Sequence, residues 1–264
     1  MKTVVHQSYR TSNVPGWITV CMESVKSWAA GCGFDYRFMD DSFLDLAPGW
    51  FRERCAGEIC PVTDLARLVM ARDLLDEGYE RAVWVDADVL VFAPQLMNVD
   101  TPTGSAFCFE LWPFLDTNWQ LQCDRKVNNS VSVFTRGNRQ LEFLIDSCER
   151  IVSSKSRVDR LELGSTFLTG LAWLLPLRVL DNIGMFSPLL MQDIASGQEQ
   201  WTAAYAAQLP APLAAANLCN SLVGVHVHGH TAPEASYDAV IEACLRTSGD
   251  IVNRHVRRQE DIRA

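Results

Sequence analysis

The chain has 264 residues, of which 48% are hydrophobic and 21% are charged, a composition typical of a globular protein with a packed core. Acidic residues outnumber basic ones by 32 to 23, and the net charge of −9 argues against a duplex nucleic-acid partner, which needs a broad basic face. The nine cysteines are an odd number without Cys-x-x-Cys zinc spacing, so free thiols are expected. The composition favours a protein that acts on small molecules.

No apolar run reaches the roughly 18 residues that a membrane-spanning helix needs, and residues 1–10 lack the apolar core of a signal peptide. We therefore expect a cytoplasmic location. Five arginines concentrate positive charge toward the C-terminus: Arg246, Arg254, Arg257, Arg258 and Arg263. They could make a weak peripheral contact with anionic lipid, but a solvated helix face is the simpler interpretation because Glu260 and Asp261 lie among them.

Apolar runs and breaks alternate along the first part of the chain in the order of strand–helix–strand units. A strand is predicted at residues 3–5, an amphipathic helix at 17–30 and a second strand at 34–39. A helix at 61–78 begins with proline and ends with glycine, and a buried strand at 82–85 follows. This order predicts an α/β fold with a mostly parallel sheet flanked by helices.

The remainder of the chain completes one domain that spans residues 1–264. Strands are predicted at 105–109, 131–134 and 222–228, and helices at 138–152, 165–175, 200–208 and 235–245. An irregular stretch that contains Trp112, Phe114 and Trp119 separates the first two of these strands. Its aromatic side chains could line a pocket, or they could simply pack in the core.

Two aspartates interrupt the apolar segment at residues 82–92. If the strand continues through them, Asp86 and Asp88 point the same way and can converge on one ion, while Ala87 turns away. Two carboxylates and substrate phosphates commonly hold Mg²⁺ or Mn²⁺, and the cation then stabilises the charge on a leaving diphosphate. A turn-capping pair is the less favoured alternative, because burying two carboxylates without a cation or another partner is costly.

The sequence Trp-Val-Asp-Ala-Asp-Val-Leu-Val at residues 84–91 resembles the Asp-x-Asp motif of nucleotide-sugar glycosyltransferases of the GT-A fold, which is Rossmann-like. Residues 5–7, Val-His-Gln, and residues 36–41, Tyr-Arg-Phe-Met-Asp-Asp, resemble the opening of glycosyltransferase family 32. The resemblance implies a GT-A fold and a sugar-nucleotide donor.

The helix at 61–78 starts with a motif that also resembles family 32. Asp64 and Arg67 match the Ser/Ala-Asp-x-x-Arg with which a helix of that family begins. The resemblance implies that both residues contact the sugar and phosphates of the donor. It also places His6, Gln7 and Trp84 among the residues that bind the donor, although a satisfied core histidine is an almost equally good interpretation of His6.

Other segments resemble family 8. They are the lead-in to the Asp-x-Asp motif at residues 77–84, the His-Val-His-Gly at 226–229, and the Asn-Asn-Ser at 128–130, which is similar to an Asn-Ala-Gly that lines the donor sugar. This resemblance implies a catalytic role for Asn128, a donor contact for Asn129 and a metal ligand among the histidines.

The histidines at 226, 228 and 230 alternate, so they would face one way if a strand persisted, but Gly229 argues against persistence. A neutral imidazole could complete a metal site begun by two carboxylates. His226 is the preferred ligand, with His228 as its rival, and a structural role for His230 and the others is the alternative.

These residues predict a metal-dependent hexosyltransferase that moves a sugar from a nucleoside-diphosphate donor, a UDP-sugar rather than a GDP-sugar, to a glycan, a lipid-linked acceptor or a small molecule. Both families imply retention of the anomeric configuration. Residues 1–100 would bind the nucleotide sugar and residues 101–264 would form the acceptor side. The catalytic residues would be Asp86, Asp88, Arg67 and Asn128.

Two other functions remain open. A haloacid-dehalogenase-like phosphohydrolase also has an Asp-x-Asp strand, but about 80 residues precede the motif here, and in that class it normally lies near the N-terminus. The second is a non-catalytic glycan-binding protein of the same fold. It is suggested by Ala232 in place of a family 8 lysine and by Gly-Ser-Thr at 164–166, which stands where family 8 has Asp-Gln-Asp.

Overall fold

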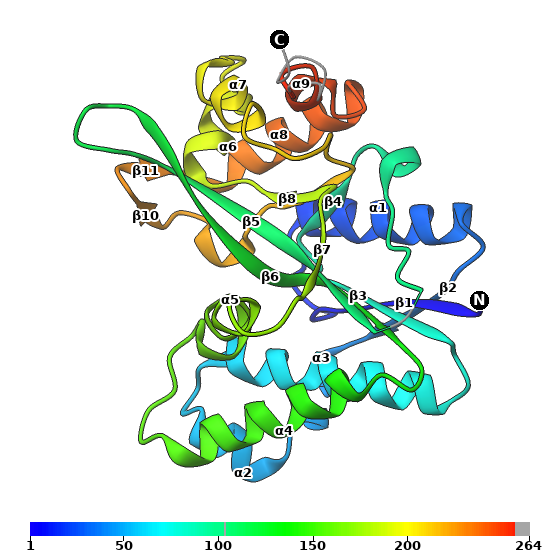
Figure 1. Cartoon of the computed structure of the whole chain (residues 1–264). Coiled ribbons are helices and arrows are strands. Elements are labelled where there is room, and N and C mark those ends of the chain that lie inside the picture. The colour runs from blue at the N-terminus through cyan, green and yellow to red at the C-terminus, as the bar shows by residue number, and fades with distance from the viewer. Residues whose placement is uncertain (103, 257–264) are drawn as a thin grey trace.

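A six-stranded sheet lies at the centre of the computed structural model, which describes residues 1–102 and 104–256 (Figure 1). The strands lie in the order β2-β1-β3-β6-β5-β7. Their bounds are Thr3–Ser8 for β1, Asp35–Met39 for β2, Arg81–Val85 for β3, Ser105–Leu115 for β5, Leu121–Thr135 for β6 and Arg178–Leu180 for β7. β1 is parallel to β2 and β3, and β7 is parallel to β5, whereas β6 is antiparallel to both of its neighbours.

A second, three-stranded sheet has the order β4-β9-β8 and shares an apolar cluster with the first. Its strands are β4 at Val89–Val91, β8 at Ile183–Met185 and β9 at Ala215–Asn217. β4 is antiparallel to β9, and β8 is parallel to β9. Two short antiparallel strands, β10 at His226–Val227 and β11 at His230–Thr231, form a separate hairpin.

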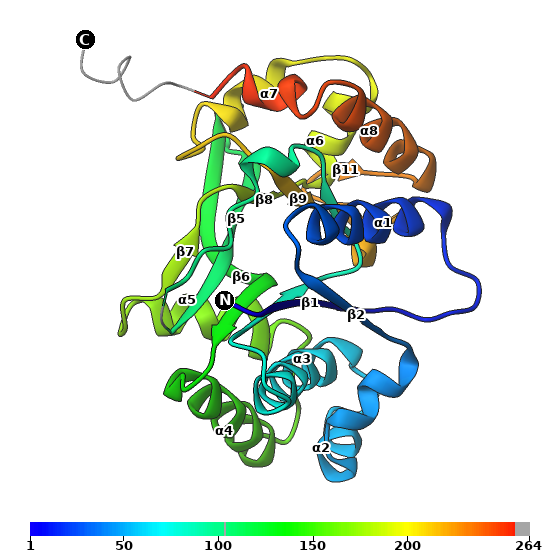
Figure 2. The ribbon, with the colours of Figure 1, turned by 90° about the vertical axis from the view of Figure 1, so that its right-hand side faces the viewer.

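Helices lie on both sides of the six-stranded sheet, so the predicted α/β class is confirmed (Figures 1 and 2). α3 and α4 lie below it in both views, and α1, α6 and α8 lie above it. The bounds are Gly16–Gly31 for α1, Gly49–Arg54 for α2, Ile59–Asp76 for α3, Arg139–Ser154 for α4, Phe167–Ala172 for α5, Pro188–Ala195 for α6, Gln200–Ala206 for α7, Glu234–Arg246 for α8 and Asp250–Asn253 for α9.

The central strands β1 and β3 carry apolar side chains on both faces, because α3 covers one face and the smaller sheet covers the other. Val4 and Trp84 pack toward α3, where they meet Leu65. Val5 and Val83 point the other way, toward the smaller sheet. Each fully buried aliphatic side chain of this kind contributes about 1.5–3 kcal/mol to the stability of the fold. Because both faces of β1 and β3 are covered, the two strands are nearly continuous apolar runs in the sequence.

The aromatic stretch that was expected to be irregular is regular, so that expectation is wrong. It forms the outer part of the long hairpin β5–β6, which projects from the body of the molecule in Figure 1. Asp116 turns the chain at the tip, where its Oδ1 accepts hydrogen bonds from the amides of Asn118 and Gln120. Trp119 lies in this tip with a φ of 60° and is 77% exposed.

The prediction of a strand at 222–228 is also wrong. A helical turn covers Asn220–Leu222, and the chain then enters the hairpin β10–β11. His228 and Gly229 form its two-residue turn with φ values of 48° and 85°. Positive φ at both positions is typical of a type I′ turn, whose twist matches that of the flanking strands.

None of the helices among residues 1–102 and 104–256 is both long enough and apolar enough to cross a membrane. Of the five C-terminal arginines, Arg246 ends α8, and Arg254 pairs with Glu199 and lies 3.9 Å from Asp250. The other three, Arg257, Arg258 and Arg263, lie outside the described residues. The proposed lipid contact stays a prediction.

Candidate functional site

Asp86 and Asp88 lie in a turn that leaves one sheet and enters the other, rather than in a continuous strand. β3 ends at Val85 and β4 begins at Val89, whose amide donates to the carbonyl of Asp86 at 3.1 Å. The amide of Asp86 donates to the carbonyl of Ser130 at 2.7 Å and so keeps a link to β6. The prediction that Asp86 and Asp88 share one face of a continuous strand is therefore wrong. The turn instead places the two carboxylates close enough for the charge of one to act on the other.

Asp88 is held by the segment that follows β9. Its Oδ1 accepts from Nδ2 of Asn217 at 3.0 Å, its Oδ2 accepts from the amide of Asn220 at 2.8 Å, and its carbonyl accepts from the amide of Leu218 at 2.9 Å. Cys219, with a φ of 57°, lets this segment curl around the carboxylate. Burial, and then the charge of Asp86, raise the pKa of Asp88 to about 7.

Asp86 uses one carboxylate oxygen for the protein and leaves the other open. Oδ1 accepts from Nε1 of Trp84 at 2.5 Å and lies 3.2 Å from Nη1 of Arg67. Over the described ranges, Oδ2 has no hydrogen-bond partner, and the side chain is 25% exposed. Burial raises the pKa of this carboxyl, and the charge of Arg67 opposes that effect.

The predicted pair on α3 is part of the same cluster. Nη2 of Arg67 lies 3.4 Å from Oδ1 of Asp64, and Nη1 donates to the carbonyl of Asn129 at 2.8 Å. Nδ2 of Asn129 donates to Oδ1 of Asp64 at 2.9 Å. Asp64 and Arg67 are each only 6% exposed, so the guanidinium is a buried link between two carboxylates and a carbonyl. Direct donor contacts by either residue stay a prediction.

Gly164, which the sequence did not single out as a site residue, packs directly on this cluster. A Cβ at this position would lie 3.1 Å from Oδ2 of Asp64 and 3.4 Å from Oδ1 of Asn129. The φ and ψ of Gly164, −89° and −116°, interrupt a helical turn at Glu162–Thr166. A side chain here would push against the buried carboxylate, which explains the glycine.

His6 and Gln7 lie on β1 next to the turn: Gln7 binds its backbone, and His6 packs beside Trp84. Nε2 of Gln7 donates to the carbonyl of Asp86 at 3.2 Å, and Oε1 of Gln7 accepts from the hydroxyl of Tyr36 at 2.9 Å. His6 is fully buried, with its ring 5.3 Å from that of Trp84. Burial lowers the pKa of His6 to about 3, so the imidazole is neutral. Neither ring nitrogen of His6 has a hydrogen-bond partner among the described residues, so His6 is buried but is not a satisfied core histidine. A donor contact by His6 or Gln7 stays a prediction.

Asn128 meets an acid that the sequence analysis missed. Its Nδ2 donates to Oε2 of Glu110 at 2.6 Å, and its Oδ1 accepts from the amide of Ser130 at 2.7 Å. Glu110 is buried on β5, and burial raises the pKa of its carboxyl. The available signal was a single acid within the apolar run Phe-Cys-Phe-Glu-Leu at 107–111.

His226 and His228 do not join the aspartates in this structure. Nδ1 of His226 lies 3.0 Å from Oγ1 of Thr231, and the ring of His228 lies beside aromatic side chains of β5. In the part of the chain that the structure describes, no three His, Cys, Asp or Glu side chains are arranged to hold a metal ion. The predicted convergence of four ligands therefore fails, because a hairpin replaces the strand that was to carry the histidines.

We expect Asp88 to make the metal-free protein less stable as the pH rises. Asp88 titrates near 7 when folded and near its ordinary value of 3.8 when unfolded, so the folded state binds more protons between these values. The Asp88 contribution to the free energy of unfolding must then fall as the pH rises through this window, whereas that of buried His6, whose pKa is lowered to about 3, rises up to about pH 6.5. Urea unfolding in EDTA at about pH 5 and about pH 8 measures the change. Asp88→Asn should remove the Asp88 part and make the slope of stability against pH more positive, and an unchanged slope in this variant would contradict the assignment.

No protein-family model matches the sequence, and no curated protein matches it. Among solved structures, one that is similar is the crystal structure of a glycosyltransferase involved in the glycosylation of the major capsid of PBCV-1. The two chains are 11% identical, and the similarity covers 90% of this chain and 98% of the other with a TM-score of 0.45. At this level of similarity, the function has to be inferred from the side chains of the site.

Proposed function

We propose that this chain is a metal-dependent glycosyltransferase in which Asp86 and Asp88 hold Mn²⁺ or Mg²⁺ against the diphosphate of a nucleotide sugar. The excess of negative charge at the turn is the observation that carries this proposal. The charges of three aspartates, Asp64, Asp86 and Asp88, act on the single guanidinium of Arg67. Among the described residues Asp88, whose pKa is raised to about 7, forms no ion pair, and a divalent cation would supply the missing positive charge.

The donor atoms fit a hard cation. Oδ2 of Asp86 is open, and each oxygen of Asp88 accepts one hydrogen bond and retains a further lone pair. Mg²⁺ and Mn²⁺ are commonly held by one or two carboxylates, with waters and substrate phosphates as the other ligands. When bound, the cation would supply Lewis-acid stabilisation of the departing diphosphate. A histidine ligand is not needed for this arrangement.

The surrounding residues would keep the two carboxylates in place. Arg67 and Trp84 fix Oδ1 of Asp86, so only its second oxygen can turn toward a cation. Asn217 and the amide of Asn220 fix Asp88 from the other sheet. This assigns Arg67 a positioning role beside any contact with the donor. Retention of configuration, a UDP-sugar donor and a glycan, lipid-linked or small-molecule acceptor are the finer parts of the proposal, and they rest on the resemblance to families 32 and 8.

We expect a nucleoside diphosphate and Mn²⁺ to bind interdependently, because the protein supplies only two carboxylates of a shell that the diphosphate completes. Calorimetric titration with UDP, first with Mn²⁺ and then with EDTA, measures the coupling. The affinity for UDP should fall at least tenfold, about 1.4 kcal/mol, when the metal is removed. Asp116→Asn at the hairpin tip should behave like wild type. Equal affinity for UDP with and without metal would refute the proposed site.

The alternatives give different results with the same protein. A phosphohydrolase would release phosphate from an aryl phosphate without any sugar nucleotide, and a glycan-binding protein would bind a donor without turnover. A thermal-shift screen of UDP-, GDP-, ADP- and CMP-sugars with and without Mn²⁺ identifies the donor, since a ligand that binds the native state raises the melting temperature.

A further inference from the structure

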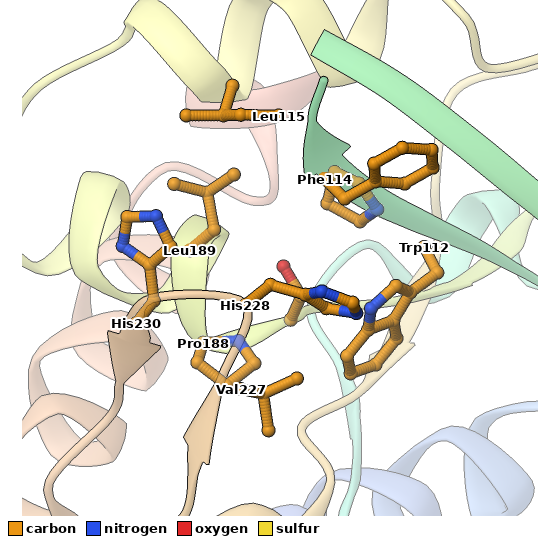
Figure 3. A pocket seen from close by; sticks show the side chains of 10 residues that line it. Trp112, Phe114, Leu115, Pro188, Leu189, Val227, His228 and His230 are labelled. Carbon is orange, nitrogen blue, oxygen red and sulfur yellow. The ribbon is translucent and has the colours of Figure 1, made fainter. Parts of the chain in front are cut away.

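A shallow surface hollow lies between the outer part of β5 and the hairpin β10–β11 (Figure 3). Trp112 and Phe114 form one side of it together with His228, and Leu189 and His230 lie on the other side. The residues that line it include no lysine, arginine, aspartate or glutamate. Its chemistry therefore suits an uncharged ligand with apolar faces rather than a phosphate or a metal ion.

The three rings form a preorganised group. Trp112 and Phe114 are two positions apart on β5, so they lie on the same face of the strand. The ring of His228 lies 6.5 Å from that of Trp112 and 6.3 Å from that of Phe114. The type I′ turn sets the position of His228 through its backbone, at a φ of 48°.

His228 differs from its two neighbours in its hydrogen bonding. Nδ1 of His226 lies 3.0 Å from Oγ1 of Thr231, and Nδ1 of His230 lies 3.0 Å from Oε1 of Gln192. Within residues 1–102 and 104–256, the ring nitrogens of His228 have no hydrogen-bond partner. A ligand in the hollow could therefore use them as donor and acceptor.

The strand β5 links the hollow to the aspartates, because Trp112 lies four residues beyond Cys108, whose thiol contacts Ser130, and the carbonyl of Ser130 accepts from the amide of Asp86. Glu110 lies two residues before Trp112 on the same face of β5, and its Oε2 accepts from Asn128. Cys219 belongs to the segment that holds Asp88, between Asn217 and Asn220. Burial, and then the charges of Asp88 and Glu110, raise the pKa of its thiol, and its amide donates to Asn217. A molecule seated in the hollow could thus extend toward the position proposed for the donor.

We propose that this hollow binds a neutral sugar ring of the acceptor, so that the acceptor is a carbohydrate. The inference rests on the proposed function. A pyranose has apolar C–H faces that pack on aromatic rings and a rim of hydroxyls that suits the free imidazole of His228. The enclosed space is only about 10 Å³, so a sugar ring would rest against the open aromatic side of the hollow rather than fill it.

Calorimetric titration with the methyl glycosides of glucose, galactose, mannose and N-acetylglucosamine tests the proposal, because these sugars cannot act as donors. The titrations are done with and without UDP and Mn²⁺. At least one glycoside should bind saturably, and Trp112→Ala and His228→Gly should each weaken it by about tenfold. Glycine fits the positive φ at position 228, so this variant keeps the turn.

Trp119→Ala is the matched control, because Trp119 lies at the tip of the same hairpin and does not line the hollow. It should bind the glycoside like wild type. Saturable binding of none of the four glycosides, or an equal loss in the variants at 112 and 119, would overturn the proposal. The affinity for UDP and Mn²⁺ should be unchanged in Trp112→Ala. A wild-type protein that binds a glycoside but not UDP would instead point to a failure of the proposed function.

Discussion

Asp88→Asn is expected to lower the rate of sugar transfer by about a thousandfold, because losing a metal ligand removes several kcal/mol of stabilisation from the departing diphosphate. The fold should remain, since Oδ1 of an asparagine can still accept from the amide of Asn220, although Nδ2 of Asn217 then loses its acceptor. The variant should also be more stable than the metal-free wild type at neutral pH, because it lacks a carboxylate whose charge is disfavoured by burial and by Asp86.

Turnover of the best donor from the thermal-shift screen, measured beside circular dichroism and urea unfolding, checks both parts of this prediction. Asp116→Asn provides the comparison, because Asp116 caps the exposed hairpin tip far along the chain from the turn. A folded Asp88→Asn protein with full activity would remove Asp88 from the mechanism. A destabilised variant would mean that Asp88 is a structural cap rather than a ligand.

Arg67→Ala is expected to lower the free energy of unfolding by about 3–5 kcal/mol, since it leaves buried carboxylates without their cationic partner. The guanidinium is 6% exposed and contacts Asp64, Asp86 and the carbonyl of Asn129. Arg67→Lys should recover only part of the loss, because an ammonium cannot make the same forked contacts. Activity should fall in both variants, because Oδ1 of Asp86 loses the group that orients it.

Arg72 on the same helix is the control, because its side chain is 37% exposed and pairs with Asp73 near the surface. Arg72→Ala should cost less than about 1 kcal/mol. Urea unfolding of the three variants at neutral pH compares them directly. Similar, small losses at 67 and 72 would show that the cluster around Asp64 tolerates an unpaired carboxylate, which would contradict the charge balance described above.

The sequence was a good guide to the first half of the fold because local pattern and burial agree there. β1, β3 and α3 are continuous apolar or helical segments whose ends carry clear breaks, and they lie where the pattern predicts them. The inner ends of β5 and β6 were predicted at 105–109 and 131–134, but the outer half of this hairpin was missed because it mixes polar and aromatic residues. Its pairing depends on a partner strand rather than on one buried face.

The site was predictable where its residues are neighbours on one element. Asp64 and Arg67 lie one turn apart on α3, and Asp86 and Asp88 are two residues apart. Asn217 reaches Asp88 across 129 positions of the chain, and Glu110 meets Asn128 across the register of two strands. Such contacts are created by tertiary packing, which a single sequence does not encode in any local period.

The turn between β3 and β4 has a further consequence for the motions of the molecule. Its first residue is tied by a backbone hydrogen bond to β6 in the large sheet, and its last is tied to the segment after β9 in the small one. Local opening of the turn would therefore have to break a backbone hydrogen bond to a strand of the large sheet and another to the segment after β9. The amides of Asp86 and Leu218 are therefore expected to exchange slowly, unlike those of a mobile lid, whose opening costs little free energy.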